Sequence, residues 1–175
     1  MLRLAVATSL LILVAGCTDP EPKEPKPTTS ATPTATAPTM PAQAKENTPE
    51  GASAFVAHYI DVFNYAANTG DVAELSRLSS PKCSGCENYI QLYRDTYENG
   101  GFFKGSDWKL GELEVTFDDG KALVFATVKS EPGTYAESSS ATPQPGNPED
   151  SDLTFVLIKK SQAWTLETLE LQAAS

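Results

Sequence analysis

The sequence predicts an α+β domain, in which three amino-terminal helices pack on a curved antiparallel sheet of four strands. Two patterns along the chain carry this prediction. Apolar residues recur at helical spacing through residues 51–98, and they alternate with polar residues from residue 113 onward. Residues 49–175 are expected to form a single domain, because about 127 residues is an ordinary size for a domain with its own core.

A first helix is expected at residues 51–69, where large apolar side chains form one ridge: Phe55, Tyr59 and Phe63. Gly70 can adopt the left-handed conformation that ends a helix. Asp71 is then expected to cap a short second helix, with Glu74 three residues later in the position of a capping-box partner. Gly70 and Asp71 together predict a sharp break between these two helices.

Capping and alternation predict the third helix and the strands. Ser84-Gly85-Cys86-Glu87 has the spacing of a capping box, and Asn99-Gly100-Gly101 is expected to end the helix. The alternating segments predict strands at residues 113–117, 121–129, 153–157 and 164–171. Asp118-Asp119-Gly120 is the expected turn between the first two strands. A slip in the alternation between Leu166 and Leu169 predicts a bulge in the last strand.

Leu13-Val14-Ala15-Gly16-Cys17 closes a short apolar run near the amino terminus and is similar to a bacterial lipobox. The run is too short to span a membrane, which takes about 20 apolar residues. Residues 1–16 are therefore interpreted as a lipoprotein signal peptide that is cleaved between Gly16 and Cys17. Cys17 is the expected site of lipid attachment. An ordinary secretory signal and a buried amino-terminal helix are the alternatives.

Residues 17–48 are expected to form a lipid-anchored, disordered tether. The segment is dominated by Pro, Thr and Ala and contains no aromatic residue, so it offers little apolar surface to bury. The lipid on Cys17 would hold the protein at the outer face of the cell membrane. The membrane is therefore a predicted partner, and the tether would lift the domain away from it.

The odd number of cysteines is explained if Cys17 carries lipid, because Cys83 and Cys86 then remain as a pair that can form a disulfide. An exported protein resides in an oxidising compartment, where a Cys83–Cys86 disulfide is the expected state. A Cys-x-x-Cys pair at the start of a helix can also perform redox chemistry, since the helix dipole lowers the pKa of a thiol. The structural disulfide is the preferred interpretation, because no strand precedes the motif as it does in thioredoxin-like proteins.

No catalytic residue, metal site or cofactor is predicted. His58 is the only histidine, and a zinc site needs three or four ligands, so we interpret His58 as a surface or partly buried structural residue. The carboxylates of Asp118 and Asp119 are assigned to a turn. Glu149, Asp150 and Asp152 lack the spacing of a calcium-binding loop.

Two further features have both a functional and a structural interpretation. Tyrosines and carboxylates could line an enolate-stabilising cavity, although aromatic residues at helical spacing usually belong to the core; the residues concerned are Tyr59, Tyr65, Tyr89, Tyr93, Asp61 and Asp107. The segment 131–151 is long and rich in Pro and Ser. Such a loop is either functional or disordered, and its composition favours disorder. Gly133-Thr134-Tyr135 within it is a candidate contact for a partner.

Five segments resemble an actinobacterial lipoprotein family, the domain-of-unknown-function family 6318: Pro49-Glu50-Gly51-Ala52, Phe63-Asn64-Tyr65-Ala66, Thr69-Gly70-Asp71, Cys83-Ser84-Gly85-Cys86 and Asn99-Gly100-Gly101. Three helices followed by a meander that ends in Ala163-Trp164-Thr165-Leu166-Glu167 resemble the nuclear transport factor 2-like, or cystatin-like, cone. The resemblance covers essentially the whole domain. It implies a fold and a location, but no activity.

The formal net charge of −10 disfavours nucleic acid as a partner, because like charges repel. The sequence therefore predicts a non-enzymatic lipoprotein whose domain binds an envelope protein, a wall fragment or a small apolar ligand. The alternative is a small-molecule enzyme or redox protein that uses the cone cavity or the Cys83/Cys86 pair.

The anchor can be tested by replacing Cys17. Cys17→Ser removes the thiol that would carry the acyl chains, and two or more chains are needed for stable membrane attachment. We expect the variant to appear in the medium, whereas the parent chain should sediment with membranes. Fractionation and immunoblotting would measure this, and a variant that stays with the membrane would contradict the anchor.

Overall fold

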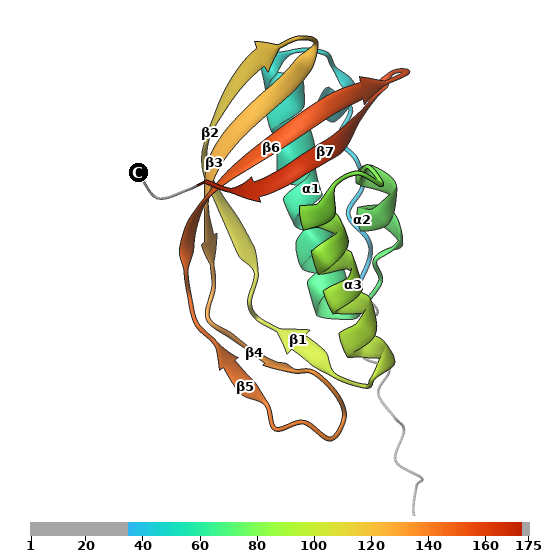
Figure 1. Ribbon diagram of the computed structural model, residues 1–175, viewed down its shortest axis with the longest axis vertical. Coiled ribbons are helices and arrows are strands. Elements are labelled where there is room, and N and C mark those ends of the chain that lie inside the picture. The colour runs from blue at the N-terminus through green and yellow to red at the C-terminus, as the bar shows by residue number, and fades with distance from the viewer. Residues whose placement is uncertain (1–34, 173–175) are drawn as a thin grey trace, which may run out of the picture. The chain divides into compact units, whose positions relative to one another are not determined.

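The computed structural model describes residues 35–172, which form an α+β domain with three α-helices and two antiparallel sheets (Figure 1). The helices are α1 (Pro49–Thr69), α2 (Ala73–Leu78) and α3 (Ser84–Glu98). The strands that follow are β1 (Phe102–Lys104), β2 (Trp108–Asp118), β3 (Lys121–Ser130), β4 (Gly133–Ala136), β5 (Gln144–Gly146), β6 (Asp150–Lys160) and β7 (Ala163–Leu171). The α+β class and the three predicted helices are confirmed. Gly16 and Cys17 lie outside the described residues.

The ends of α1 follow from local hydrogen bonding. Thr48 caps the helix, since its hydroxyl oxygen accepts from the Gly51 N–H at 3.0 Å, and Pro49 occupies the first turn. Gly70 ends the helix at φ 76°, as predicted. Val72, and not Asp71 as predicted, is the N-cap residue of α2. The Asp71 carboxylate accepts from the N–H of Ala73, the first residue of the helix, at 3.1 Å.

The predicted capping box of α3 is wrong. Cys83, and not Ser84, is the N-cap, and its sulfur accepts from the Cys86 N–H at 3.2 Å. The sulfur can occupy this position because Cys83 is bonded to Cys86 in a disulfide. The helix stops at Glu98, and Gly100 takes φ 73°, so the predicted end is confirmed.

The four predicted strands form one antiparallel sheet with the order β2-β3-β6-β7. Asp119 and Gly120 connect β2 to β3 with φ values of 45° and 73°, the left-handed pair that a tight hairpin requires. Val156 pairs with Thr168 and Leu157 with Leu166, so Glu167 is the extra residue of the predicted bulge in β7.

The predicted disorder of residues 131–151 is wrong. This segment contains β4 and β5, which pair with β1 in a second sheet of order β1-β4-β5. The three strands have only three or four residues each, too few to show a period, and they are stable because they pair with one another.

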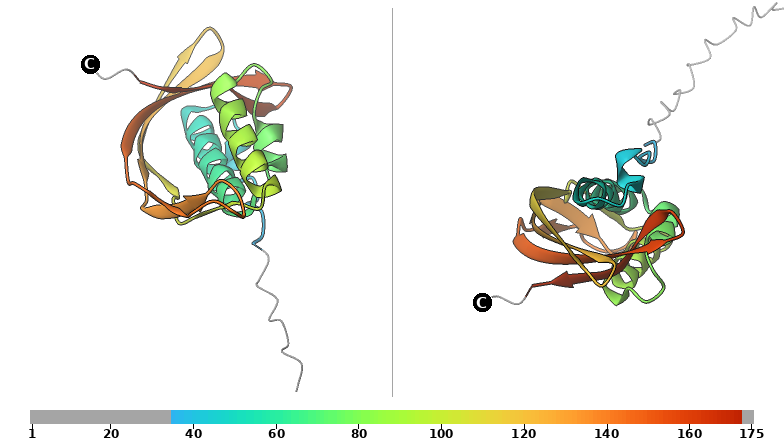
Figure 2. Two further views of the ribbon diagram at one scale, coloured as in Figure 1. Left: turned by 60° about the horizontal axis from the view of Figure 1, so that its bottom comes forward. Right: turned by 90° about the horizontal axis from the view of Figure 1, so that it is seen from above.

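The two sheets continue one another across a common bend. Each strand of the β1-β4-β5 sheet connects to the strand at the same position in the order β2-β3-β6. The connections, here called the bend line, are residues 105–107, 131–132 and 147–149. Gly105 has φ 85°, and Pro132 and Pro148 cannot donate to a ladder, so regular pairing stops in all three strands. The curved sheet wraps around α1 (Figures 1 and 2).

The core lies between the helices and the concave face of the sheet. Its largest fully buried members come from α1, α2, β6 and β7: Phe55, Tyr59, Phe63, Leu75, Leu78, Phe155, Leu157 and Leu166. The segment between α2 and α3 also covers the free edge of β7, because the Ser80 N–H donates to the Leu166 carbonyl at 2.7 Å. None of the helices within residues 35–172 is both long enough and apolar enough to cross a membrane.

The predicted boundary between tether and domain at residue 49 is too late. Residues 35–48, here called the amino-terminal arm, pack on the domain, and Ala44 is buried. The Trp164 indole N–H donates to the Glu46 carbonyl at 2.9 Å, and the Lys159 ammonium donates to the Lys45 carbonyl at 2.7 Å. The composition of the arm concealed this packing, since both of these hydrogen bonds use backbone oxygens. The rest of the predicted tether lies outside the described residues.

Candidate functional site

A hollow of about 260 Å³ lies between α3 and the bent sheet. Five aromatic side chains line it together with several polar ones, and we call it the aromatic cleft. The lining rings come from α3 and from both sheets: Tyr89, Tyr93, Phe103, Trp108 and Tyr135. Leu92 stands on its margin and is 44% exposed, so the cleft is accessible from solvent.

The rings touch one another and fix the shape of the cleft. Tyr93 meets Phe103 edge to face at 5.3 Å, and Phe103 stacks on Tyr135 at 5.8 Å. Tyr89 meets Trp108 edge to face at 5.4 Å. These separations and angles are those of favourable aromatic pairs. Phe63 of α1 packs against Trp108 at 4.3 Å and joins the cleft to the core.

Two further hollows lie beside the cleft, next to α3 and the bent sheet. Their volumes are about 120 Å³ and 290 Å³, and both are lined by Tyr89 and Trp108. One reaches Val128 and Ser151 on the concave face, and the other reaches Gly85 at the start of α3. Tyr89 and Trp108 therefore line all three hollows.

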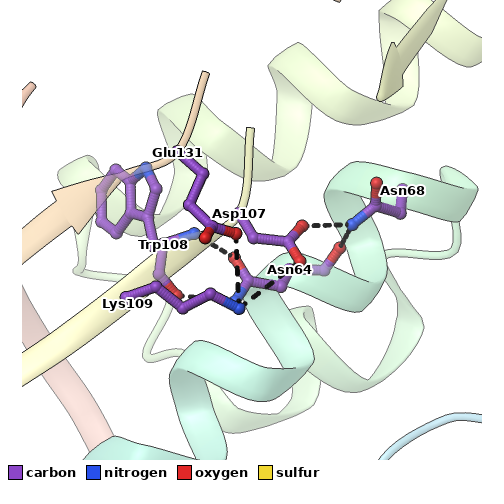
Figure 3. A network of polar contacts seen from close by, with 6 residues as sticks. All are labelled: Asn64, Asn68, Asp107, Trp108, Lys109 and Glu131. Atoms are coloured by element: carbon purple, nitrogen blue, oxygen red, sulfur yellow. Dashed lines mark hydrogen bonds and ion pairs between the residues drawn. The ribbon is translucent and has the colours of Figure 1, made fainter. Parts of the chain in front are cut away.

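Asn64 of α1 holds the bend in place (Figure 3). Its amide nitrogen donates to the Trp108 carbonyl at 2.9 Å, and its amide oxygen accepts from the Trp108 N–H at 2.8 Å. One side chain thus satisfies both backbone groups of the residue at which β2 begins. This pair fixes the backbone of a cleft residue to the central helix.

Three charged side chains lie near the Asn64–Trp108 contact (Figure 3): Asp107, Lys109 and Glu131. Asp107 accepts from the Asn68 amide at 2.7 Å and lies 3.9 Å from the Lys109 ammonium. Lys109 also lies 3.5 Å from Glu131. These groups connect α1 to the bend line of two neighbouring strands, and exposed contacts of this kind contribute little each.

Close backbone approach completes the bend. The Glu131 N–H donates to the Asp107 carbonyl at 2.8 Å, and the Ser130 N–H donates to the Glu149 carbonyl at 2.9 Å. A Cβ at Gly133 would collide with Ser106, so this position accepts no side chain. Close backbone packing and hydrogen bonds between adjacent strands therefore hold the bend in one conformation.

The titratable groups of the cleft are phenols and carboxylates, and its other polar side chains are those of Asn68, Ser106, Ser130 and Asn147. Burial raises the pKa of Tyr93, and burial together with the nearby Glu149 raises the pKa of Tyr89, so both phenols stay protonated at neutral pH. Asp107 and Glu149 line the cleft at the bend line. Lys and Arg are absent from the described residues that line it. The site therefore presents aromatic rings, neutral hydroxyls and negative charge.

The structure brings some of the residues of the enolate hypothesis together and separates others. Tyr89, Tyr93 and Asp107 share the aromatic cleft. The Tyr59 hydroxyl is instead hydrogen bonded to Ser79 at 3.0 Å within the core. The other two residues lie away from the cleft: Tyr65, whose hydroxyl donates to Asp71, and Asp61, which is exposed on α1.

The Cys83–Cys86 disulfide is present, and it is buried. The two residues are 2% and 1% exposed, and both belong to the core. A Cβ at Gly85 would collide with the Leu169 carbonyl, so the glycine of this motif allows α3 to approach β7 closely. Disulfide exchange requires access to a sulfur, so this geometry favours a structural role.

His58 is more buried than predicted, at 3% exposure. Burial lowers its pKa, against the opposing influence of Glu74 and Asp61, and its Nε2 has no hydrogen-bond partner within residues 35–172. The apolar ridge of α1 is wide enough to include the histidine. The described part of the chain contains no group of three or more residues that could hold a metal ion.

The clusters of acidic residues have ordinary structural positions. Asp119 forms the hairpin turn, as predicted. The Asp152 carboxylate accepts from the Thr127 hydroxyl at 2.7 Å across the sheet. Of the acidic residues in these clusters, Glu149 alone lines the cleft.

Phe103 and Trp108 were not predicted from the sequence as site residues. The signal available for them was an aromatic residue on each side of Gly105.

Residues 24–170 match a protein family described as a family of unknown function (DUF6318). A search of curated proteins finds no match. Among solved structures, the chain is similar to the intermembrane space region of the chloroplast protein ARC6, at 13% identity and a TM-score of 0.54, over 74% of this chain and 99% of that one.

Two further structures come from bacteria. The Kfla4162 protein of Kribbella flavida matches at 14% identity and a TM-score of 0.52, over 73% of this chain and 94% of that one. An uncharacterized protein with a cystatin-like fold from Caulobacter vibrioides matches at 15% identity and a TM-score of 0.44, over 71% and 91%. Likeness at such identities concerns the fold and carries no activity.

Asn64 can be tested against its neighbour one turn along α1. Asn64→Ala leaves the Trp108 N–H and carbonyl without partners, and we expect it to lower the free energy of unfolding by about 2 kcal/mol. Asn68→Ala removes exposed bonds only and should cost less than about 1 kcal/mol. Urea unfolding followed by circular dichroism measures both. Equal losses would show that Asn64 has no special role at the bend.

The disulfide can be tested by removal and by reduction. Replacing both cysteines with serine should lower the free energy of unfolding by about 2 kcal/mol, because the bridge closes only a short loop. The folded parent chain should resist dithiothreitol, since both sulfurs are buried. Thiol labelling with mass spectrometry measures the reduction. Rapid reduction of the folded chain, or reduction of insulin by it, would indicate a redox role.

Proposed function

Because the chain belongs to the family of unknown function DUF6318, which carries no assigned activity, we propose a function from the site itself. The protein is a membrane-anchored extracytoplasmic lipoprotein, and its domain binds a small, largely apolar molecule in the aromatic cleft. The single observation that carries the binding proposal is the cleft, a concave, aromatic and accessible site positioned by a clamped bend.

The anchor rests on the sequence. The lipobox-like segment ends at Cys17, and the pairing of Cys83 with Cys86 leaves Cys17 as the one remaining cysteine. A lipid on Cys17 explains this odd cysteine. Residues 18–34 would then connect the anchor to the amino-terminal arm, which docks on the domain near Trp164.

The cleft has the properties of a small-molecule site. Such sites are concave and mainly apolar, with a few polar groups that orient the ligand. Here the rings supply apolar surface, and the neutral hydroxyls of Tyr89 and Tyr93 supply hydrogen-bonding groups. The rings are held by mutual contacts and by Asn64, so the site needs little ordering when a ligand binds.

A second candidate function, a small-molecule enzyme, is favoured by one observation. The cleft combines Tyr89 and Tyr93 with Asp107 and Glu149, a pairing of phenol and carboxylate that can stabilise an enolate. Binding without chemistry is the preferred proposal, because an Asp107 oxygen is already engaged by Asn68 and Glu149 is exposed. The redox alternative is disfavoured by the burial of both cysteines.

The binding proposal can be tested with N-phenyl-1-naphthylamine, a neutral dye that fluoresces in apolar sites. The chain from residue 17 onward, with Cys17→Ser so that no lipid competes, should bind the dye saturably. Tyr135→Ser removes one aromatic wall and should weaken binding about fivefold. Fluorescence titration measures the dissociation constant.

Tyr65→Ser is the matched control, because Tyr65 is also half-buried but does not line the cleft. We expect this variant to bind the dye like the parent chain. Circular dichroism establishes that both variants are folded. No saturable binding, or equal weakening by the two substitutions, would refute the cleft as the binding site.

A further inference from the structure

We propose that the aromatic cleft selects an organic cation with a quaternary ammonium group over a neutral molecule of the same shape. This inference rests on the proposed function and assigns a chemical class to its ligand. The juxtaposition that carries it is a cluster of aromatic rings at a bend line bearing Asp107 and Glu149.

The rings supply the first half of the argument. The face of an aromatic ring is electronegative, and quaternary ammonium groups bind in cages of such rings. The lining of the cleft contains five aromatic side chains from four separate segments of the fold, so a ligand would be surrounded by rings on several sides. Trp108, whose indole is the strongest type of partner for a cation, is one of these five.

The charges supply the second half. Asp107 and Glu149 line the cleft, and no described Lys or Arg does. Lys109 is the cation that lies near Asp107, and it is shared with Glu131 at 3.5 Å. After burial, Glu149 is the second cause of the raised pKa of Tyr89, so its charge acts on a phenol that lines the cleft. A cationic ligand at the same place would be attracted by that charge, and an anionic ligand would be repelled.

The same lining disfavours the other cations. A metal ion needs several carboxylates or imidazoles within reach, and residues 35–172 contain no such group. A primary ammonium must find acceptors for three N–H groups when it is buried, and rings supply none. A quaternary ammonium has no N–H to satisfy. Its methyl groups can pack on the rings while the charge remains near Asp107 and Glu149.

Choline and 3,3-dimethyl-1-butanol test this inference, because they have the same shape and differ by one charge. We expect choline to shift the amide and indole NMR signals of Trp108 and to bind at least about fivefold more tightly than the alcohol. Titrations at matched ionic strength measure both affinities. Added salt should weaken choline binding, because Glu149 is exposed.

Two substitutions at Tyr89 distinguish the contribution of its aromatic ring to choline affinity from that of its apolar bulk. Tyr89→Phe keeps the aromatic face and should change choline affinity by less than about twofold, whereas Tyr89→Leu should lower it at least about fivefold. The alcohol should respond little to either change. Glu149→Gln should lower choline affinity and reduce its dependence on salt.

The outcomes distinguish this inference from the proposed function. If the neutral dye binds in the cleft and the alcohol binds as well as choline, the cation preference is wrong and small-molecule binding stands. Choline selectivity that survives Tyr89→Leu would also overturn the inference, since the rings would not be its source. If neither the dye nor choline binds, both proposals fail.

Discussion

Two hydrogen bonds between the Asn64 amide and the Trp108 backbone are the constraint on which the site depends. They join the carboxyl-terminal part of α1 to the first residue of β2, next to the bend line between the two sheets. Because three strands turn at the same level, fixing one of them positions the others through the bonds at Asp107 and Ser130. The aromatic cleft is the concave space that this bend creates.

The opposite wall of the cleft is positioned by different means. The Cys83–Cys86 disulfide caps α3, and Gly85 allows the start of the helix to lie against β7. Tyr89 and Tyr93 follow one and two turns later on the same helix and face the rings of the bent sheet. The Cys-x-x-Cys motif thus contributes to the site by placing α3, although its sulfurs are buried away from any reaction partner.

Periodicity and capping were sufficient to predict the helices, the four-stranded sheet, the hairpin at Asp119 and the bulge at Glu167. They could not reveal β1, β4 and β5, because strands of three or four residues are stabilised by partners distant in sequence. Asn64 lies beside the apolar ridge of α1, and its partner is 44 residues away. Tyr89 and Tyr93 were interpreted as core, and only the bend shows that these side chains border a hollow.

Hydrogen exchange at the Trp108 amide tests most directly whether the bend is clamped. The account predicts that this N–H is protected about as strongly as the central amides of β3, because its bond to Asn64 can open only when α1 and the sheet separate. Heteronuclear NMR of the full chain measures both rates. Exchange as fast as that of an exposed loop would contradict the account, since the cleft would then have no fixed wall.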